Sequence, residues 1–359
     1  MPVDSVVVRQ RLPSSTTLRR PPRIPAVAGG VDSASISDTI SSFHPAAPCL
    51  PAPTNIVSPL SAANMQNHRD ISLVLQDSSI FHGYGFGANV PVSGECVFQT
   101  GIFSYQFFSF FKFFLGMVGY PESLTDPSYR GQLLVLTYPL IGNYGVPAFP
   151  PASPLLATFE SAHIHAAALI IGNYQHECFS HHSAKQSLSA WLESQGVPGI
   201  YGVDTRALTK RIREHGVMLA KLVPGHISHA SHLALDHADL KDPNTLNLVA
   251  QVSITHPKLF SPKDIPDGVP QKYAKDGSPL RILAIDVGMK FNQIRCFLRR
   301  GVELLVVPWD YDFVNTTETY HGLFISNGPG DPTMVKTTID RLGQAMQARR
   351  TPIFGYALA

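Results

Sequence analysis

The clearest place for chemistry in this sequence is the loop Asn327-Gly-Pro-Gly-Asp-Pro332, which follows an apolar run that ends at Ser326. Gly328 and Gly330 leave backbone N–H groups accessible, as an oxyanion or another anionic ligand requires, while the two prolines stiffen the loop. In open parallel sheets, ligands gather at the carboxyl ends of strands, so this loop is the first candidate site. The spacing alone leaves a rigid structural turn as the alternative.

A second candidate position follows the apolar segment Thr351-Pro-Ile-Phe-Gly355. A strained turn at the end of a strand can project a nucleophile over the sheet, and a thiol there would be activated by a neighbouring base. The residues that the sequence offers after this segment cannot serve as such a nucleophile: Tyr356, Ala357, Leu358 and Ala359. The residues alone therefore do not say which reaction this position serves.

Metal and modification sites have less support. His163 and His165 are expected to share one face of a strand, yet no carboxylate or cysteine completes a ligand set, which favours ordinary surface or core histidines. Asn315-Thr-Thr317 matches a glycosylation acceptor, which a cytosolic chain would not use. Four widely spaced cysteines without a CxxC pair predict reduced, mostly buried thiols in a cytosolic protein: Cys49, Cys96, Cys178 and Cys296.

Composition excludes several classes of protein. The chain has 359 residues, of which 44% are hydrophobic and 15% charged, with 28 Lys and Arg against 26 Asp and Glu. This near-balance argues against a dedicated nucleic-acid binder, which needs clustered positive charge. No stretch of about 18 residues is apolar enough to cross a bilayer. The nearest approach, residues 102–116, is too short and carries Lys112.

The sequence divides into several segments with different expected secondary structure, and these must position the candidate residues. Residues 1–68 are rich in Pro and Ser and lack periodicity, which predicts a disordered tail. Its arginines are compatible with a mitochondrial presequence, but its prolines break the amphipathic helix that a presequence needs. Residues 69–222 are expected to form a β-rich domain that mixes strands with helices. Its strands are expected at 72–75, 80–84, 90–101 and 131–137, and its helices begin near 188 and 204.

Residues 223–279 are irregular, with several His, Pro and Asp residues, and are expected to be a linker. From Arg281 the pattern becomes strand, glycine turn, helix and strand, a βαβ unit that implies a parallel sheet with a right-handed crossover. Further elements are expected at 322–326, 335–349 and 351–355. The sequence then stops within an element, which predicts that the domain at 280–359 is truncated and marginal alone.

Six blocks of the sequence carry a family resemblance, and they occur in order along the chain: 93–101, 117–131, 136–147, 202–206, 286–296 and 326–332. From about residue 70 to residue 355 the chain resembles the small subunit of carbamoyl phosphate synthetase. The sequences Asn292-Gln-Ile-Arg-Cys296 and Val307-Pro-Trp-Asp310 resemble the multifunctional pyrimidine-pathway protein of fungi and animals more than the separate arginine-pathway subunit.

The resemblance implies an α/β protein with two domains. The first is peculiar to these synthetases and docks on the large synthetase subunit or domain. The second is a class I glutamine amidotransferase with a flavodoxin-like parallel sheet. In the family a cysteine, helped by His and Glu, cleaves glutamine, and the ammonia travels to the synthetase, where bicarbonate and ATP yield carbamoyl phosphate. This portion is expected to need no cofactor, since ATP and Mg belong to the synthetase partner.

The resemblance also implies which residues hold glutamine. Ser128 matches a serine that holds the substrate, and Gly328 and Gly330 match the loop that holds it. Leu358 matches the residue after the nucleophile, whose N–H completes the oxyanion hole. Ala357 stands where the family has its cysteine. A methyl group forms neither a thiolate nor an acyl-enzyme, and the family's His and Glu lie in a later segment, so the chain as written is expected not to hydrolyse glutamine.

A second departure from the family is the insertion at 102–116, which holds seven Phe in 15 residues. Either it is an intron retained in the gene model, with 356–359 a second missed splice, or it is a hydrophobic loop for a partner or membrane.

The expected function is therefore the ammonia-supplying portion of a glutamine-dependent carbamoyl phosphate synthetase in pyrimidine synthesis. The alternatives are an arginine-pathway small subunit and a non-catalytic module that docks on a synthetase. The expected partners are the synthetase large subunit or domain and glutamine, with neither nucleic acid nor membrane. The expected location is the cytoplasm, with the mitochondrion as the alternative.

Overall fold

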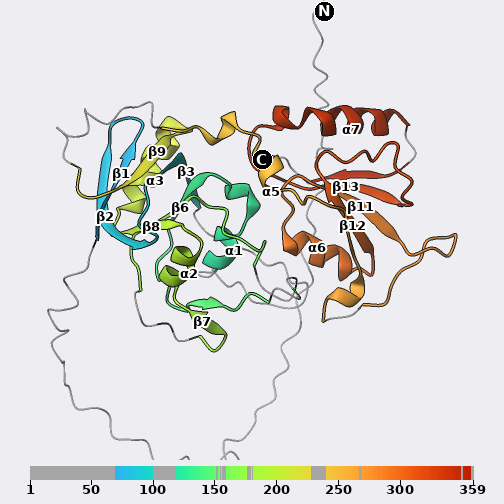
Figure 1. Cartoon of the computed structure of the whole chain (residues 1–359), viewed down its shortest axis with the longest axis horizontal. Coiled ribbons are helices and arrows are strands. Elements are labelled where there is room, and N and C mark those ends of the chain that lie inside the picture. The colour runs from blue at the N-terminus through green and yellow to red at the C-terminus, as the bar shows by residue number, and fades with distance from the viewer. Residues whose placement is uncertain are drawn as a thin grey trace, which may run out of the picture. The chain divides into compact units, whose positions relative to one another are not determined.

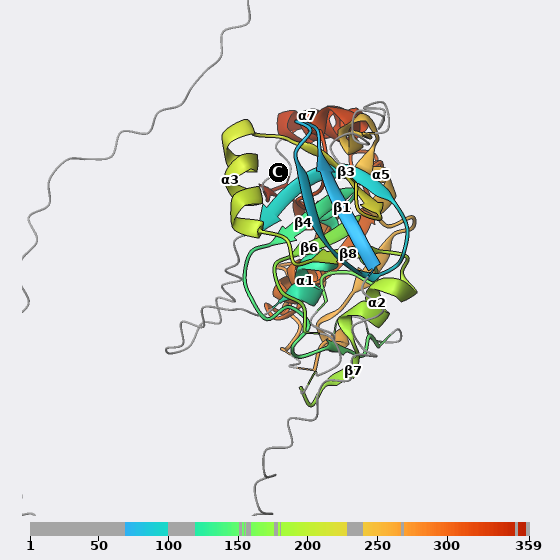
Figure 2. The same ribbon diagram turned by 90° about the vertical axis from the view of Figure 1, so that its left-hand side faces the viewer.

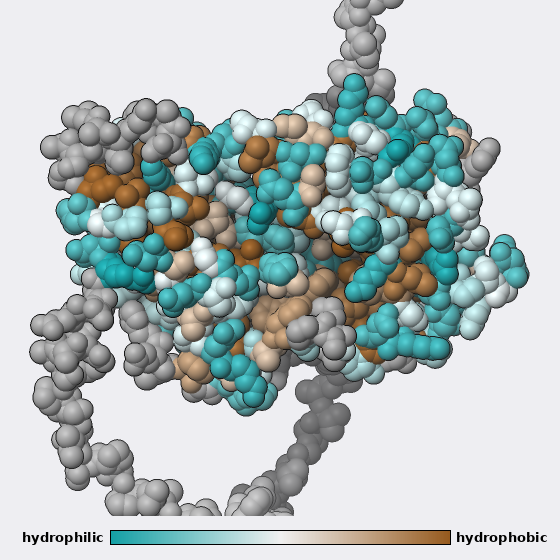
Figure 3. Space-filling model, viewed as in Figure 1, coloured by the Kyte–Doolittle hydropathy of each residue, from teal (hydrophilic) through white to brown (hydrophobic). Residues whose placement is uncertain are grey.

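The computed structural model describes residues 69–99, 119–150, 153, 155, 159–175, 179, 181–227, 240–266, 269–348 and 351–356. The predicted tail at 1–68, the insertion at 102–116, and positions 357–359 lie outside these residues. Within the described ranges, no helix combines the length and the apolar character that crossing a membrane requires. On the face shown in Figure 3, hydrophobic residues form separate patches among hydrophilic ones.

A closed barrel occupies the first part of the described chain, with strand order β1-β2-β8-β6-β4-β3-β9. The pairs β3–β4, β4–β6 and β6–β8 are parallel, and the other neighbours are antiparallel. The barrel closes because β1 pairs with β9, a strand that follows it by more than a hundred residues. Its strands are β1 (Arg69–Leu75), β2 (Ile80–Gly87), β3 (Val92–Gln99), β4 (Gln132–Leu136), β6 (Ala168–Ile171), β8 (Pro198–Tyr201) and β9 (Leu219–Pro224).

Helices pack with residues on both faces of the barrel strand β4. Leu133 and Val135 pack in one cluster with Leu208 of α3 (Thr205–His215), and Leu134 packs in a second cluster with Trp191 of α2 (Leu188–Ser194). Alternate residues of a strand point to opposite faces, so β4 is buried on both. Figure 2 shows α3 and α2 on different sides of these strands. The short elements α1 (Tyr120–Leu124), β5 (Val146–Pro147) and β7 (Ala184–Gln186) complete this region.

A five-stranded sheet follows, with order β10-β12-β11-β13-β14. From β12 to β14 the strands are parallel, and their 2-1-3-4 order is that of a flavodoxin-like fold. Figure 1 shows α7 on one side of the sheet and α6 on the other. The elements are β10 (Lys258–Phe260), β11 (Arg281–Asp286), α6 (Phe291–Leu298), β12 (Glu303–Pro308), β13 (Gly322–Ile325), α7 (Lys336–Ala348) and β14 (Ile353–Gly355). The expected α/β class is confirmed by this sheet and the matched amidotransferase segment.

The segment expected to be a linker is more ordered than its composition indicates. Its strand β10 pairs antiparallel with β12 and so joins the second sheet. Its helix α5 (Leu248–Val252) buries Leu248 and Val249, and Val249 packs with the strands β11 and β13. These residues are therefore not irregular throughout, because they supply an edge strand and core side chains to the second sheet.

Candidate functional site

The glycine loop that follows β13 is packed directly against the turn that follows β11. A Cβ added to Gly328 would lie 1.7 Å from the Val287 carbonyl oxygen, and one added to Gly288 would lie 2.9 Å from the Gly328 Cα. Ser326 joins the two segments as well, since its Oγ accepts a hydrogen bond from the Val287 N–H at 3.0 Å. Gly328 is thus required by space, and Gly330 by its positive φ of 78°.

Asp286 fixes the turn on which this loop rests. Its Oδ1 accepts hydrogen bonds from the N–H groups of Gly288 at 2.9 Å and Met289 at 2.7 Å. Its Oδ2 accepts from the Ile254 N–H at 2.8 Å. Burial raises the pKa of this carboxyl above its ordinary value, although the three N–H donors act in the opposite direction. The Asp286 side chain therefore stabilises the backbone of the turn, since all three of these hydrogen bonds are made to backbone N–H groups.

The structure brings Ser128 to the glycine loop from the barrel. Asp126 caps the turn Pro127–Tyr129, because its Oδ1 accepts the Ser128 N–H at 3.0 Å. The Ser128 Oγ then accepts a hydrogen bond from Asn327 Nδ2 at 2.9 Å, across 199 residues of sequence. Three of the predicted site residues, Ser128, Gly328 and Gly330, are therefore on neighbouring segments, whereas Leu358 lies outside the described residues.

Two contacts at this site were missed by the sequence predictions. Gln293 Nε2 donates to Asn327 Oδ1 at 2.8 Å, so both ends of the Asn327 amide are engaged. Lys290, the residue before α6, forms an ion pair with Asp126. Both Lys290 and Gln293 lie in the block 286–296 that carries the family resemblance, which is the one signal that could have pointed to them. Their partners are far away in sequence, so no local pattern shows the pairing.

The histidine pair does not lie where the sequence predicted it. His163 and His165 precede β6 in irregular structure, and they are not on a strand. His163 is exposed, whereas His165 is half-buried, and its partial burial lowers the pKa of its imidazole to about 4. Across the described ranges, no group of three or more His, Cys, Asp or Glu side chains is placed to hold a metal ion.

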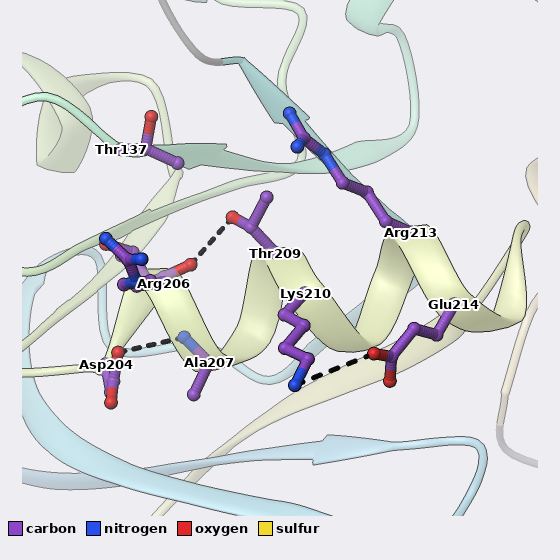
Figure 4. A pocket seen from close by; sticks show the side chains of 9 residues that line it. Thr137, Asp204, Arg206, Ala207, Thr209, Lys210, Arg213 and Glu214 are labelled. Carbon is purple, nitrogen blue, oxygen red and sulfur yellow. Dashed lines mark hydrogen bonds and ion pairs between the residues drawn. The ribbon is translucent and has the colours of Figure 1, made fainter.

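A separate hollow of about 990 Å³ lies beside α3, and Figure 4 shows the residues that line it. Arg206 and Arg213 line it together with Thr137. Two of its lining residues, Lys210 and Glu214, form an ion pair with each other at 3.8 Å. Ser128 and the glycine loop do not contribute to this hollow, so it is distinct from the candidate site.

The described site brings a hydroxyl and backbone groups together. Ser128 supplies a hydroxyl whose oxygen already accepts one hydrogen bond, and the main chain of the glycine loop lies close against Val287 and Leu248. Such donors suit a carboxylate or a developing oxyanion. The family resemblance predicts that position 357 is where the family has its thiol, and the residue there is Ala357, which carries only a methyl group.

Comparison with known families agrees with this arrangement. Residues 111–222 match the carbamoyl-phosphate synthase small chain, CPSase domain, and residues 283–358 match the glutamine amidotransferase class-I family. The fold and site thus define a small-chain domain followed by an amidotransferase segment. The chain is similar to carbamoyl-phosphate synthase small chains and to class-I glutamine amidotransferases over these two segments, and the resemblance drawn from the sequence is confirmed.

Individual relatives are long multifunctional proteins as well as separate small chains. The multifunctional protein pyrABCN of Emericella nidulans is 48% identical over 353 residues, which are 94% of this chain and 14% of that protein. The multifunctional protein ura1 of Schizosaccharomyces pombe is 51% identical over 306 residues, 81% of this chain and 13% of that protein. The carbamoyl phosphate synthase arginine-specific small chain of Emericella nidulans is 39% identical over 316 residues, 87% of this chain and 62% of that protein.

Proposed function

We propose that this chain is the glutamine-binding portion of a glutamine-dependent carbamoyl phosphate synthetase. One observation carries the proposal: the Ser128 hydroxyl of the barrel is held 2.9 Å from Asn327, at the start of the glycine loop of the second sheet. A site built from a serine of one domain and a glycine loop of the other is what the family resemblance implies for holding glutamine. Ser128, Gly328, Gly330 and the Leu358 N–H are the proposed binding groups.

Glutamine binding can be measured directly with the 359-residue chain by isothermal titration calorimetry. We expect saturable binding of glutamine, and a loss of about tenfold or more in affinity for Ser128→Ala, because the hydroxyl that faces the loop is removed. Ser194→Ala is the matched control, since Ser194 is an exposed serine on α2. Absence of glutamine binding, or equal binding by wild type and Ser128→Ala, would contradict the proposal.

A second function is favoured by the residue at position 357. Because Ala357 removes the thiol, the chain would act as a non-catalytic module that docks on a synthetase large subunit or domain. Co-purification with a separately expressed synthetase portion tests this. Binding without release of ammonia from glutamine supports the docking module, whereas ammonia release in the same mixture favours the enzyme component.

The proposed pathway is pyrimidine synthesis. The multifunctional relatives are 48% and 51% identical to this chain, against 39% for the arginine-specific small chain. Growth tests decide between the two pathways: disruption of the gene is expected to produce a requirement for a pyrimidine and not for arginine. The proposed location is the cytoplasm, and a mitochondrial signal from a fluorescent fusion of the full chain would overturn that assignment.

A further inference from the structure

Glu160 is a buried acid that neither the family resemblance nor the proposed glutamine contacts use. It lies in the irregular segment before β6 and is only 2% exposed. A carboxyl group in such a position needs hydrogen bonds or a partner charge to offset the loss of water. Its partners come from two different parts of the fold, the first turn of α6 and the turn that carries Ser128.

On one side Glu160 holds the beginning of α6. Its Oε2 accepts the Asn292 N–H at 3.0 Å, and its backbone oxygen accepts the Phe291 N–H at 2.8 Å. Both N–H groups belong to the first turn of the helix, where no partner exists within the helix itself. Arg295, one turn further along α6, places Nη2 at 3.9 Å from the same carboxyl oxygen. The acid thus caps α6 from another domain.

On the other side the same segment holds the turn that carries Ser128. The Glu160 N–H donates to Thr125 Oγ1 at 3.0 Å, and the Ser161 Oγ donates to the Thr125 carbonyl oxygen at 2.7 Å. Thr125 directly precedes Asp126, whose carboxylate caps the Ser128 turn. A displacement of Glu160 would therefore be transmitted to Ser128 through three consecutive residues of main chain.

These contacts close a ring around the candidate site. From α6, Gln293 bonds to Asn327, which bonds to the Ser128 hydroxyl at 2.9 Å. From Ser128 the main chain leads back to Thr125, and from there Glu160 leads back to α6. Each link in the ring is a hydrogen bond or a short piece of backbone. Ser128 is therefore fixed relative to the glycine loop from two directions, directly by Asn327 and indirectly by Glu160.

We infer that Glu160 is a positioning residue, which holds the Ser128 hydroxyl in register with the glycine loop by tying the Thr125 segment to the first turn of α6. The inference rests on the proposed function, because it assigns a role within the same glutamine site. A displacement of about 1 Å in a positioned group can cost about a hundredfold in activity, so we expect disruption of this ring to weaken ligand binding at the same site.

The test uses two variants of Glu160 in the full chain. Glu160→Ala removes every side-chain contact to α6, whereas Glu160→Gln keeps an oxygen that can accept the Asn292 N–H. We expect Glu160→Ala to weaken glutamine binding about tenfold or more and Glu160→Gln to stay within about threefold of wild type. Glu193→Ala, a change of an exposed acid on α2, is the matched control and is expected to bind as wild type does.

Hydrogen exchange supplies a readout that does not depend on glutamine. We expect Glu160→Ala to lose protection at the amides of 128–130, while the amides of β1 keep theirs. If Glu160→Ala does not fold, Thr125→Val removes the other end of the link and is expected to expose the same amides.

The outcomes separate the two proposals. If Ser128→Ala loses glutamine while Glu160→Ala, or Thr125→Val in its place, binds as wild type, the positioning role is overturned and the proposed function stands. If wild type binds no glutamine, the proposed function fails, and unchanged protection of 128–130 in these variants would overturn the positioning role as well.

Discussion

Replacement of Gly328 by alanine is the most direct test of how the glycine loop is built. The added Cβ would lie 1.7 Å from the Val287 carbonyl oxygen. Non-bonded atoms normally stay roughly 3.5 Å apart, so the two segments must separate by more than an ångström. The obstructing atom belongs to the main chain, and therefore no change of side-chain rotamer relieves the clash.

The expected cost follows from this geometry. Backbone shifts forced by an oversized residue in a packed region cost about 1–3 kcal/mol. Here the shift would also stretch the hydrogen bond from the Val287 N–H to Ser326 Oγ, which is 3.0 Å long. We expect Gly328→Ala to lower the free energy of unfolding by about 3 kcal/mol, which corresponds to a fall in Tm of about 6–12 °C.

Tryptophan fluorescence can follow this loss in the second sheet alone. The chain has two tryptophans, Trp191 on α2 and Trp309 after β12. In a Trp191→Phe background, urea denaturation reports on Trp309, and therefore on the region of Gly328. Gly343→Ala is the matched control, because Gly343 lies within α7 and an added Cβ there meets no atom within 4 Å. It is expected to stabilise by about 0.5–1 kcal/mol. A Gly328→Ala chain as stable as wild type would refute this explanation of the loop.

Three further predictions concern buried or missing groups. Burial lowers the pKa of His165 from 6.5 to about 4, so below pH 6.5 the unfolded chain binds a proton that the folded chain does not. Between pH 7.5 and pH 4, wild type should therefore lose up to about 3 kcal/mol of stability relative to His165→Leu. Parallel pH profiles of the two proteins in urea denaturation would contradict this. Asp286→Asn must turn an amide nitrogen toward at least one of the three backbone N–H donors that the carboxylate now accepts. We expect the free energy of unfolding to fall by about 2 kcal/mol in the same denaturation assay. A change below about 0.5 kcal/mol would show that the turn does not depend on the carboxylate. The resemblance predicts Ala357 at the nucleophile position, so the purified 359-residue chain should release no ammonia from glutamine, and turnover in an ammonia assay that survives thiol alkylation would be the contrary result.

Local patterns predicted the elements whose signals lie within a few residues. α3 begins where Asp204 caps it, since its side chain accepts the Ala207 N–H at 2.9 Å, and it ends at Gly216, whose φ is 79°. β10 could not be found in this way, because Lys258–Phe260 is three residues long with two of them exposed. Its place in the sheet depends on the neighbouring strand β12, which no local pattern shows.

In the candidate site, too, local patterns predicted some residues and could not predict others. Gly328 and Gly330 were prominent because a glycine loop after a strand is a pattern with its own physical meaning. Ser128 came only from the family resemblance, since nothing within its own segment connects it with Asn327. The ion pair of Lys290 with Asp126 and the cap that Glu160 forms on α6 join segments more than a hundred residues apart, so they could be seen only in the folded chain.

In the proposed site the groups that would hold glutamine are separate from the position expected for a nucleophile. The proposed holding groups lie on the turn before β4 and on the loop after β13, whereas the position that the resemblance predicts for the thiol follows β14. The bond between Ser128 and Asn327, and the ring through Glu160 that supports it, include no atom of residues after Gly355. If Ala357 stands at the nucleophile position, as the resemblance predicts, the absent thiol removes the covalent chemistry without removing these contacts. The proposed glutamine binding therefore does not depend on residue 357, and the binding assay with Ser128→Ala tests it separately from any ammonia release.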